Sequence, residues 1–115
     1  MDFDQVRKIA LALPDVEEGM AYGTPAFRVR GRFLAPLHDD GEALVIRIGE
    51  FERQALMEVE PETYYITDHY VRSPYVLIRF AKAEPGDVRR LFEQAWRTQA
   101  PKRLIAEFDK RFKNS

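Results

Sequence analysis

The sequence has no cysteine and very little serine or histidine. It contains two serines, Ser73 and Ser115, and two histidines, His38 and His69. The absence of cysteine excludes disulfide bonds, thiolate metal sites and cysteine nucleophiles. A serine-based catalytic triad would need Ser73, His69 and Asp68 to converge, and such close neighbours on one loop rarely reach that geometry. We therefore expect a domain that is not an enzyme.

Phosphate-binding loops and clustered metal ligands are missing as well. The 6 glycines are scattered as single turn residues, so neither a P-loop nor a dinucleotide-binding fingerprint is present. His38, Asp39 and Asp40 offer ligands for a hard cation, but adjacent residues at the end of a hairpin are more typical of turn chemistry. We expect neither a cofactor nor a metal.

The sequence also lacks any long hydrophobic run. No stretch approaches the roughly 20 apolar residues that span a bilayer, and no apolar signal segment follows the acidic residues 1–4. Hydrophobic residues make up 45% and charged residues 32% of the chain, which is ordinary for a folded protein. These features predict one soluble domain over residues 1–115, located in the cytoplasm and not bound to membranes. The oligomeric state stays open.

Neither sign of charge is in large excess, since the formal net charge is -1. This argues against a protein that coats nucleic acid by charge alone. The charges are unevenly distributed, however: residues 50–62 hold five glutamates and one arginine, whereas residues 87–113 hold eight basic and four acidic side chains. Arg28, Arg30 and Arg32 form a further basic cluster. Such clusters are either solvated surface or binding sites.

The hydrophobic pattern predicts an α+β fold. A helix over residues 3–13 is expected, with Asp2 and Gln5 forming a capping box and Pro14 ending it. Residues 15–23 form a loop or a short edge strand. Alternating residues predict strands over 26–29, 33–38, 43–48 and 75–80, and helical spacing predicts helices over 50–60 and from Pro85 onward with a break at Pro101. The order fits an antiparallel meander with helices packed on one face.

The turn between the first two predicted strands decides which side chains share a face. A two-residue turn at 30–31 would place Arg32 on the apolar face, whereas a three-residue loop at 30–32 pairs Val29 with Phe33 and Phe27 with Ala35. We prefer the three-residue loop because the apolar side chains of these strands then all lie on the same face of the sheet. It predicts a core face of Phe27, Val29, Phe33, Ala35, Leu37, Leu44, Ile46 and Ile48. Separately, the pattern of the helix over 50–60 predicts that Phe51, Ala55, Leu56 and Val59 point inward.

The same register gives the opposite face of the sheet an unusual composition. It would carry Arg28, Leu34, Pro36, His38, Val45 and Arg47, joined by Tyr75, Leu77 and Arg79 if the later strand enters the sheet. A half-apolar surface with three arginines fits a dimer interface, a ligand cleft covered by another element, or a phosphate-binding surface.

Residues 64–75 contain four tyrosines, one histidine and one arginine. Tyrosine and arginine are over-represented in binding sites because they supply stacking and hydrogen bonds at low entropic cost. The candidate ligand-binding residues are Tyr65, His69, Tyr70 and Tyr75. The alternative is a structural loop that covers an edge of the core.

Short motifs along nearly the whole chain resemble the MmcQ/YjbR family. They are LPDVEE at residues 13–18, YGTPAFRVRG at 22–31, HY at 69–70, PYVLIR at 74–79, AW at 95–96 and APKRL at 100–104. The resemblance implies a small α+β fold of the double-wing type in bacterial cytosolic proteins that are commonly labelled DNA-binding. It brings no established catalytic residues, so no residue role is carried over from the family.

Three functional hypotheses follow. The first is a non-enzymatic DNA-binding domain that contacts phosphates through Arg28, Arg30, Arg32, Arg47 and Arg79. The second is a small-ligand or protein-interaction module centred on the tyrosine-rich loop, His69 and the arginine face. The third is an enzyme of unfamiliar chemistry that uses His69. The net charge near zero weakens the first hypothesis and leaves the second untouched.

Overall fold

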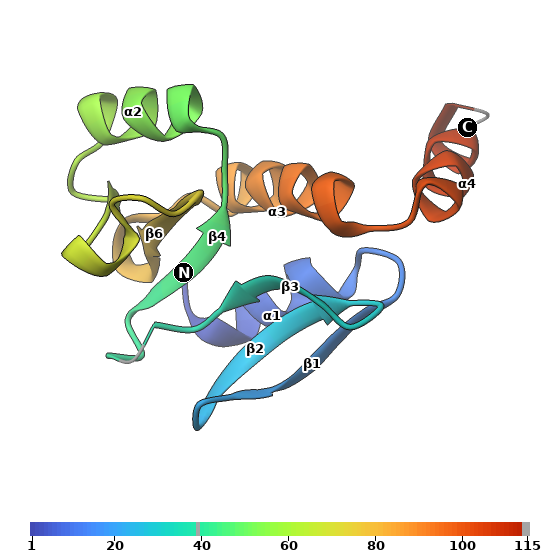
Figure 1. The fold of residues 1–115 in the computed structure, drawn as a ribbon, viewed down its shortest axis with the longest axis horizontal. Helices are drawn as coiled ribbons and strands as arrows, with labels where there is room; N and C mark the ends of the chain where they lie inside the picture. Colours follow the sequence, from blue (N-terminus) through green and yellow to red (C-terminus); the bar gives the residue numbers. More distant parts are fainter. Residues whose placement is uncertain (39, 114–115) are drawn as a thin grey trace.

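Two three-stranded antiparallel sheets form the framework of the molecule (Figure 1). The computed structural model describes residues 1–38 and 40–113. The first sheet has the order β1-β2-β3 and the second has the order β4-β6-β5, with β6 in its centre. The α+β fold class is thereby confirmed. The strands are β1 (Val16–Ala21), β2 (Thr24–Val29), β3 (Arg32–Pro36), β4 (Ala43–Arg47), β5 (Tyr64–Tyr65) and β6 (Tyr75–Arg79).

Four α-helices surround these sheets. α3 packs against α1, β3 and β4, so it bridges the two sheets, while α2 lies over the second sheet at one end of the molecule and α4 lies at the other end (Figure 1). No helix in the described part of the chain is long and apolar enough to cross a membrane. The helices are α1 (Phe3–Leu11), α2 (Glu50–Val59), α3 (Pro85–Gln99) and α4 (Lys102–Lys113), with short 3-10 turns at Asp68–Tyr70 and Phe80–Lys82.

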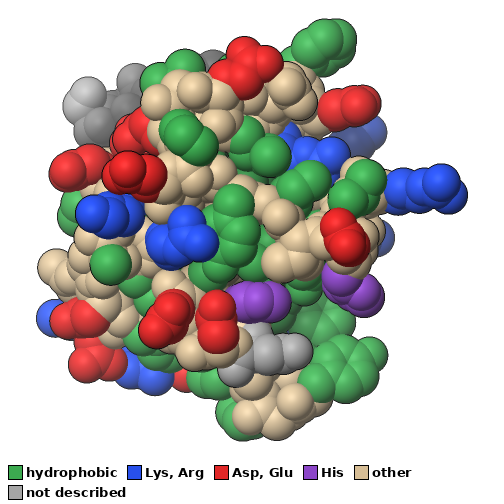
Figure 2. All heavy atoms as spheres, turned by 90° about the vertical axis from the view of Figure 1, so that its left-hand side faces the viewer, with side chains coloured by type: hydrophobic (Ala, Val, Ile, Leu, Met, Phe, Trp, Pro, Cys, Tyr) green, Lys and Arg blue, Asp and Glu red, His purple; other side chains and the backbone are tan. Residues whose placement is uncertain are grey.

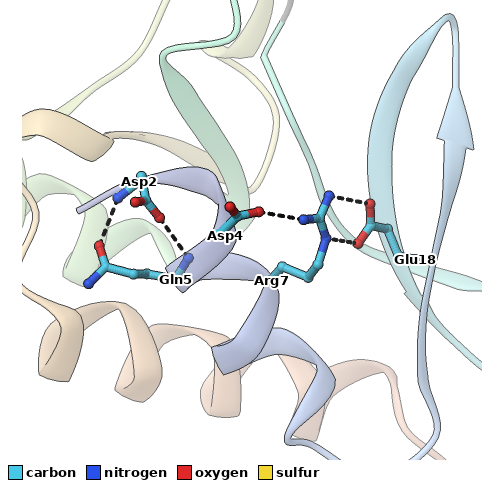
Figure 3. Close-up of polar contacts among 5 residues, drawn as sticks. All are labelled: Asp2, Asp4, Gln5, Arg7 and Glu18. Carbon is cyan, nitrogen blue, oxygen red and sulfur yellow. Dashed lines mark hydrogen bonds and ion pairs between the residues drawn. The ribbon is translucent and has the colours of Figure 1, made fainter.

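The start of α1 has the predicted capping box (Figure 3). The backbone N–H of Gln5 donates to Asp2 Oδ1 and the N–H of Asp2 donates to Gln5 Oε1, each at 2.9 Å. One turn later, the Arg7 guanidinium lies 2.5 Å from a Glu18 carboxylate oxygen on β1 and 2.6 Å from Asp4. α1 ends at Leu11, earlier than predicted, and the segment left open between a loop and a strand is the edge strand β1.

The predicted register of the β2–β3 hairpin is wrong in one respect. Arg30 and Gly31 both have positive φ values, 50° and 84°, and form a two-residue turn in which Val29 faces Arg32. A bulge between Phe27 and Arg28 then shifts the register, so that Phe27 still faces Ala35 as predicted. Turns with two positive φ values match the twist of paired strands, and the bulge absorbs the extra residue.

The bulge exchanges two neighbouring side chains between the faces. Leu34, predicted on the outer face, is 0% exposed in the core, whereas Phe33, predicted in the core, is 40% exposed on the outer face. Phe27, Val29 and Ala35 are buried as predicted.

The expected meander is also interrupted between β3 and β4. Leu37 and Leu44 form an isolated bridge, but β4 then pairs with β6 rather than continuing along β3. The two sheets can therefore diverge, and the space between their outer faces is the site described below. Leu44 and Ile46 remain in the common core.

The last two helices match the sequence pattern and α2 does not. In α3, the helical spacing from which the helix was predicted is that of its buried residues, Val88, Leu91, Phe92, Ala95 and Trp96. In α2, however, Phe51 is 95% and Val59 77% exposed, and Ala55 is exposed too, so their predicted inward orientation is wrong. Leu56 is half-buried. Phe51, Ala55 and Val59 recur every four positions on one side of the helix. The other side of α2, with Arg53 and Met57, faces the protein.

Candidate functional site: an aromatic cleft between the two sheets

A cleft of about 460 Å³ lies where the outer faces of the two sheets meet. We call it the aromatic cleft. Figure 2, which views this end of the molecule, shows histidine side chains beside hydrophobic surface. The cleft is lined by strand, turn and loop residues: Ala21, Tyr22, Thr24, Phe33, Pro36, Leu37, His38, Val45, Thr67, His69, Tyr70 and Tyr75.

The first sheet contributes two exposed rings to the cleft. Tyr22 is at the β1–β2 turn, where it has a φ of 52° and is followed by Gly23 with a φ of 83°. Its side chain is fully exposed. Phe33 reaches the cleft because the β2 bulge turns it away from the core, and the Arg28 guanidinium carbon lies 4.3 Å from the centre of its ring. This wall is therefore aromatic, with a cation behind it.

The second sheet contributes a cluster of rings on an apolar base. Val45 packs in a small buried group with Ala43 and Leu77, on which Tyr70 and Tyr75 rest. The rings of Tyr70 and Tyr75 are 6.1 Å apart in a T-shaped contact, a favourable arrangement for aromatic pairs. The His69 ring makes a second T-shaped contact with Tyr70 at 4.8 Å.

One arginine on α2 fixes the loop that carries these rings. Nη1 of Arg53 donates to the carbonyl oxygens of Tyr70 at 3.1 Å, Ser73 at 2.8 Å and Tyr75 at 3.1 Å, and Nη2 donates to that of Val71 at 3.2 Å. A guanidinium is suited to this because its five N–H donors lie in a rigid plane. Arg53 therefore determines the backbone path between Tyr70 and Tyr75.

The electrostatics of the cleft are set by neutral polar groups. Among the described residues, its lining includes no acidic side chain, lysine or arginine. Beside the buried Val45 group, burial raises the pKa of Tyr65, with a further contribution from Asp40. On the other face of β5, in the main core, burial raises the pKa of Tyr64 to about 12. Their phenols are therefore protonated at neutral pH. No group of three or more metal ligands exists among the described residues.

Comparison with protein families identifies the fold independently. The model of the family described as YjbR matches residues 11–98. The chain belongs to the YjbR family. The resemblance expected from the sequence motifs is thus confirmed, and with it the α+β fold.

Similar proteins of two mycobacteria are uncharacterised. One protein of Mycobacterium tuberculosis and one of Mycobacterium bovis are each 38% identical over 69 residues, covering 59% of this chain and 54% of the relative. This chain thus matches about half the length of these relatives. The crystal structure of the Deinococcus radiodurans protein DR2400, assigned to the domain DUF419, aligns with a TM-score of 0.70 and 16% identity over 83% of this chain and 75% of that one. This likeness shows the shared fold.

The structure brings most of the predicted tyrosine-loop residues together. His69, Tyr70 and Tyr75 all line the aromatic cleft. Tyr65 lies outside the lining, where the Arg79 guanidinium carbon stands 4.1 Å from the centre of its ring. The side chain of His69 is exposed. Tyr22 and Phe33 were missed: the Tyr-Gly pair signals a turn, whereas the bulge that exposes Phe33 has no local signal.

The five predicted arginines do not form one surface. Arg28 and Arg47 flank the cleft, with Arg47 Nη1 3.5 Å from the hydroxyl of Tyr75. Arg30 and Arg32 lie at the β2–β3 turn, where Arg30 Nε pairs with Asp15 at 2.6 Å. Arg79, at the far end of β6, donates to the carbonyl of Glu62 at 2.9 Å. The side chains are therefore distributed over three places.

Proposed function

We propose that this YjbR-family domain is a non-enzymatic binding module that holds a small ligand with a planar ring in the aromatic cleft. The observation that carries the proposal is the composition of the lining. Six of its members are ring systems, namely Tyr22, Phe33, His38, His69, Tyr70 and Tyr75, and they surround a concave site of about 460 Å³. That volume is in the range of small-molecule sites.

The chemistry of the walls favours a flat ligand with hydrogen-bonding edges. Aromatic rings with polar tips can stack on a planar ring and bond its edge at the same time. The tyrosine hydroxyls, the imidazoles of His38 and His69, and the hydroxyls of Thr24 and Thr67 supply both donors and acceptors. The lining has no charged carboxylate or guanidinium among the described residues, so the part of the ligand inside the cleft is uncharged, since an unpaired charge is costly to bury.

The test is an amide chemical-shift titration with adenosine and with indole, two planar probes of different polarity. We expect the largest changes at Phe33, Thr67, His69 and Tyr70. Phe33→Ala should weaken binding at least 5-fold, roughly the loss of one stacking contact of about 1 kcal/mol. Phe51→Ala is the control, because Phe51 is also an exposed phenylalanine but lies on α2, outside the lining. Changes spread evenly over the surface, or equal effects of the two variants, would refute the proposal.

DNA binding is a second candidate, favoured by the exposure of Arg30 and Arg32 on one hairpin turn. If three to five arginines contact phosphates, the logarithm of the affinity should fall against the logarithm of salt concentration with a slope of about −3 to −4. Replacing Arg30 and Arg32 with alanine should reduce the slope by roughly two. Duplex DNA that binds without salt dependence, or leaves the spectrum unchanged at low salt, would exclude this candidate.

A further inference from the structure

Two arginines stand directly behind the walls of the aromatic cleft, one on each sheet. The Arg28 guanidinium carbon is 4.3 Å from the centre of the Phe33 ring, and that of Arg47 is 5.8 Å from the centre of the Tyr75 ring. Phe33 and Tyr75 both line the cleft. Arg28 and Arg47 are each half-buried. Each guanidinium is thus separated from the cleft by a single ring.

Neither of these arginines has an acidic partner among the described residues. Arg28 donates to the carbonyl of Met20 at 3.4 Å, and Arg47 donates to the hydroxyl of Tyr75 at 3.5 Å. Both are long contacts for groups with five N–H donors each. By contrast, Arg7 and Arg97 each pair with two carboxylates, and Arg30, Arg90 and Arg103 with one. Among the described residues, the two arginines beside the cleft therefore form no ion pair, and most of their guanidinium donors are unused.

We infer that the ligand of the cleft is an aromatic acid: a planar ring that carries a carboxylate or a phosphate, with the ring in the cleft and the anionic group at Arg28 or Arg47. The inference rests on the proposed function and names the class of its ligand. An anionic group fits at the margin because charge-assisted hydrogen bonds to guanidinium are strong and directional. It does not fit deeper, where the described lining has no cation to pair with it.

Two described carboxylates on this side form no ion pair with either arginine: Glu17, the register partner of Arg28 on β1, and Asp40. Asp40 Oδ2 lies 3.9 Å from His38 Nε2, on the segment between β3 and β4. A ligand carboxylate or phosphate would therefore approach Arg28 or Arg47 without displacing an existing ion pair of either residue.

The experiment compares charged and neutral probes that share a ring. AMP is paired with adenosine and indole-3-acetate with indole-3-acetamide, and dissociation constants are measured by amide chemical-shift titration at constant ionic strength. We expect the charged member of at least one pair to bind about 10-fold more tightly, as one charge-assisted hydrogen bond provides. The pair that shows the difference identifies phosphate or carboxylate as the preferred group.

Variants then locate the anionic group. The double variant Arg28→Gln with Arg47→Gln should bring the ratio of the two dissociation constants to about 1, and the single variants should show which guanidinium is responsible. Arg32→Gln is the matched control, since Arg32 is an exposed arginine of β3 outside the lining, and it should leave the ratio unchanged. Arg28→Lys and Arg47→Lys keep the charge and should retain part of the preference; they serve as the test if the glutamine variants do not fold.

The possible failures of the inference and of the proposed function are distinguishable. If charged and neutral probes bind the cleft equally, or if the ratio is unaffected by both Arg28 and Arg47 variants, the aromatic-acid inference is wrong and the proposed function stands. If none of the four probes shifts the cleft residues, both are refuted. If only a single-stranded oligonucleotide binds, with a steep salt dependence, the cleft is a nucleic-acid site and the aromatic-acid inference is again wrong.

Discussion

Truncating two adjacent residues of β3 tests the hairpin register on which the cleft depends. Leu34 is 0% exposed and belongs to the core, whereas Phe33 is 40% exposed and contacts Arg28 across the bulge. Leu34→Ala removes three buried carbon groups, a loss of about 2.4 kcal/mol in transfer free energy alone. The cavity left behind raises the total to about 3–4 kcal/mol.

Phe33→Ala should be much milder. It removes a ring that is partly solvated already, together with a cation–π contact of about 0.5–1 kcal/mol, so we expect a loss of about 1–1.5 kcal/mol. A chain of this size has roughly 5–15 kcal/mol of stability, and both variants should therefore fold. The three-residue loop that the sequence favours predicts the reverse order of the two losses.

The assay is urea unfolding of the wild type and of both variants, followed by tryptophan fluorescence. Trp96 is fully buried between α3 and the core, so its emission reports global unfolding. Thermal melting is an independent measurement, in which Leu34→Ala should lower Tm by roughly 10–20 °C and Phe33→Ala by roughly 3–6 °C. Equal losses, or a larger loss for Phe33→Ala, would mean that Phe33 is a core residue and that the described cleft does not exist in solution.

Three further predictions concern the loop beside the cleft and one tyrosine of the core. Arg53→Lys cannot reproduce four planar contacts, so residues 70–75 should exchange their amide hydrogens faster and adenosine should bind more weakly; unchanged exchange would show that Arg53 does not hold the loop. His69→Ala should change the unfolding free energy by less than about 0.5 kcal/mol because the side chain is exposed, and a loss of about 1–3 kcal/mol would assign it a structural role instead. The pKa of Tyr64 is raised to about 12 in the folded state, so the unfolded chain releases this proton first as pH rises, and stability should decline between about pH 10 and 12; Tyr64→Phe should remove that part of the decline.

The sequence alone predicted the structure of those segments that are stabilised by contacts between residues close together in the chain. The Asp2–Gln5 capping box and the buried face of α3 depend on contacts a few residues apart, and both were predicted. β6 places Val76 and Ile78 in the core and Tyr75 on the opposite face, as the alternation of the strand requires. The family motifs spread along the chain predicted the fold to which these elements belong.

Tertiary structure alone decided where the faces of these elements point. The β2 bulge exposes Phe33 and buries Leu34. It arises because a two-residue turn must be combined with the packing of the first sheet, and no short sequence pattern predicts it. α2 likewise exposes Phe51 because Arg53, on its inner side, binds carbonyl groups of a loop 17 to 22 residues away in sequence.

The candidate site shows the same division. The sequence indicated His69, Tyr70 and Tyr75 by composition, because tyrosine is over-represented in binding sites. It could not join them to Tyr22 and Phe33, which come from the other sheet. That juxtaposition exists because β4 leaves the first sheet after one bridge and pairs with β6, and long-range strand pairing is chosen by the packing of the whole core rather than by any local preference.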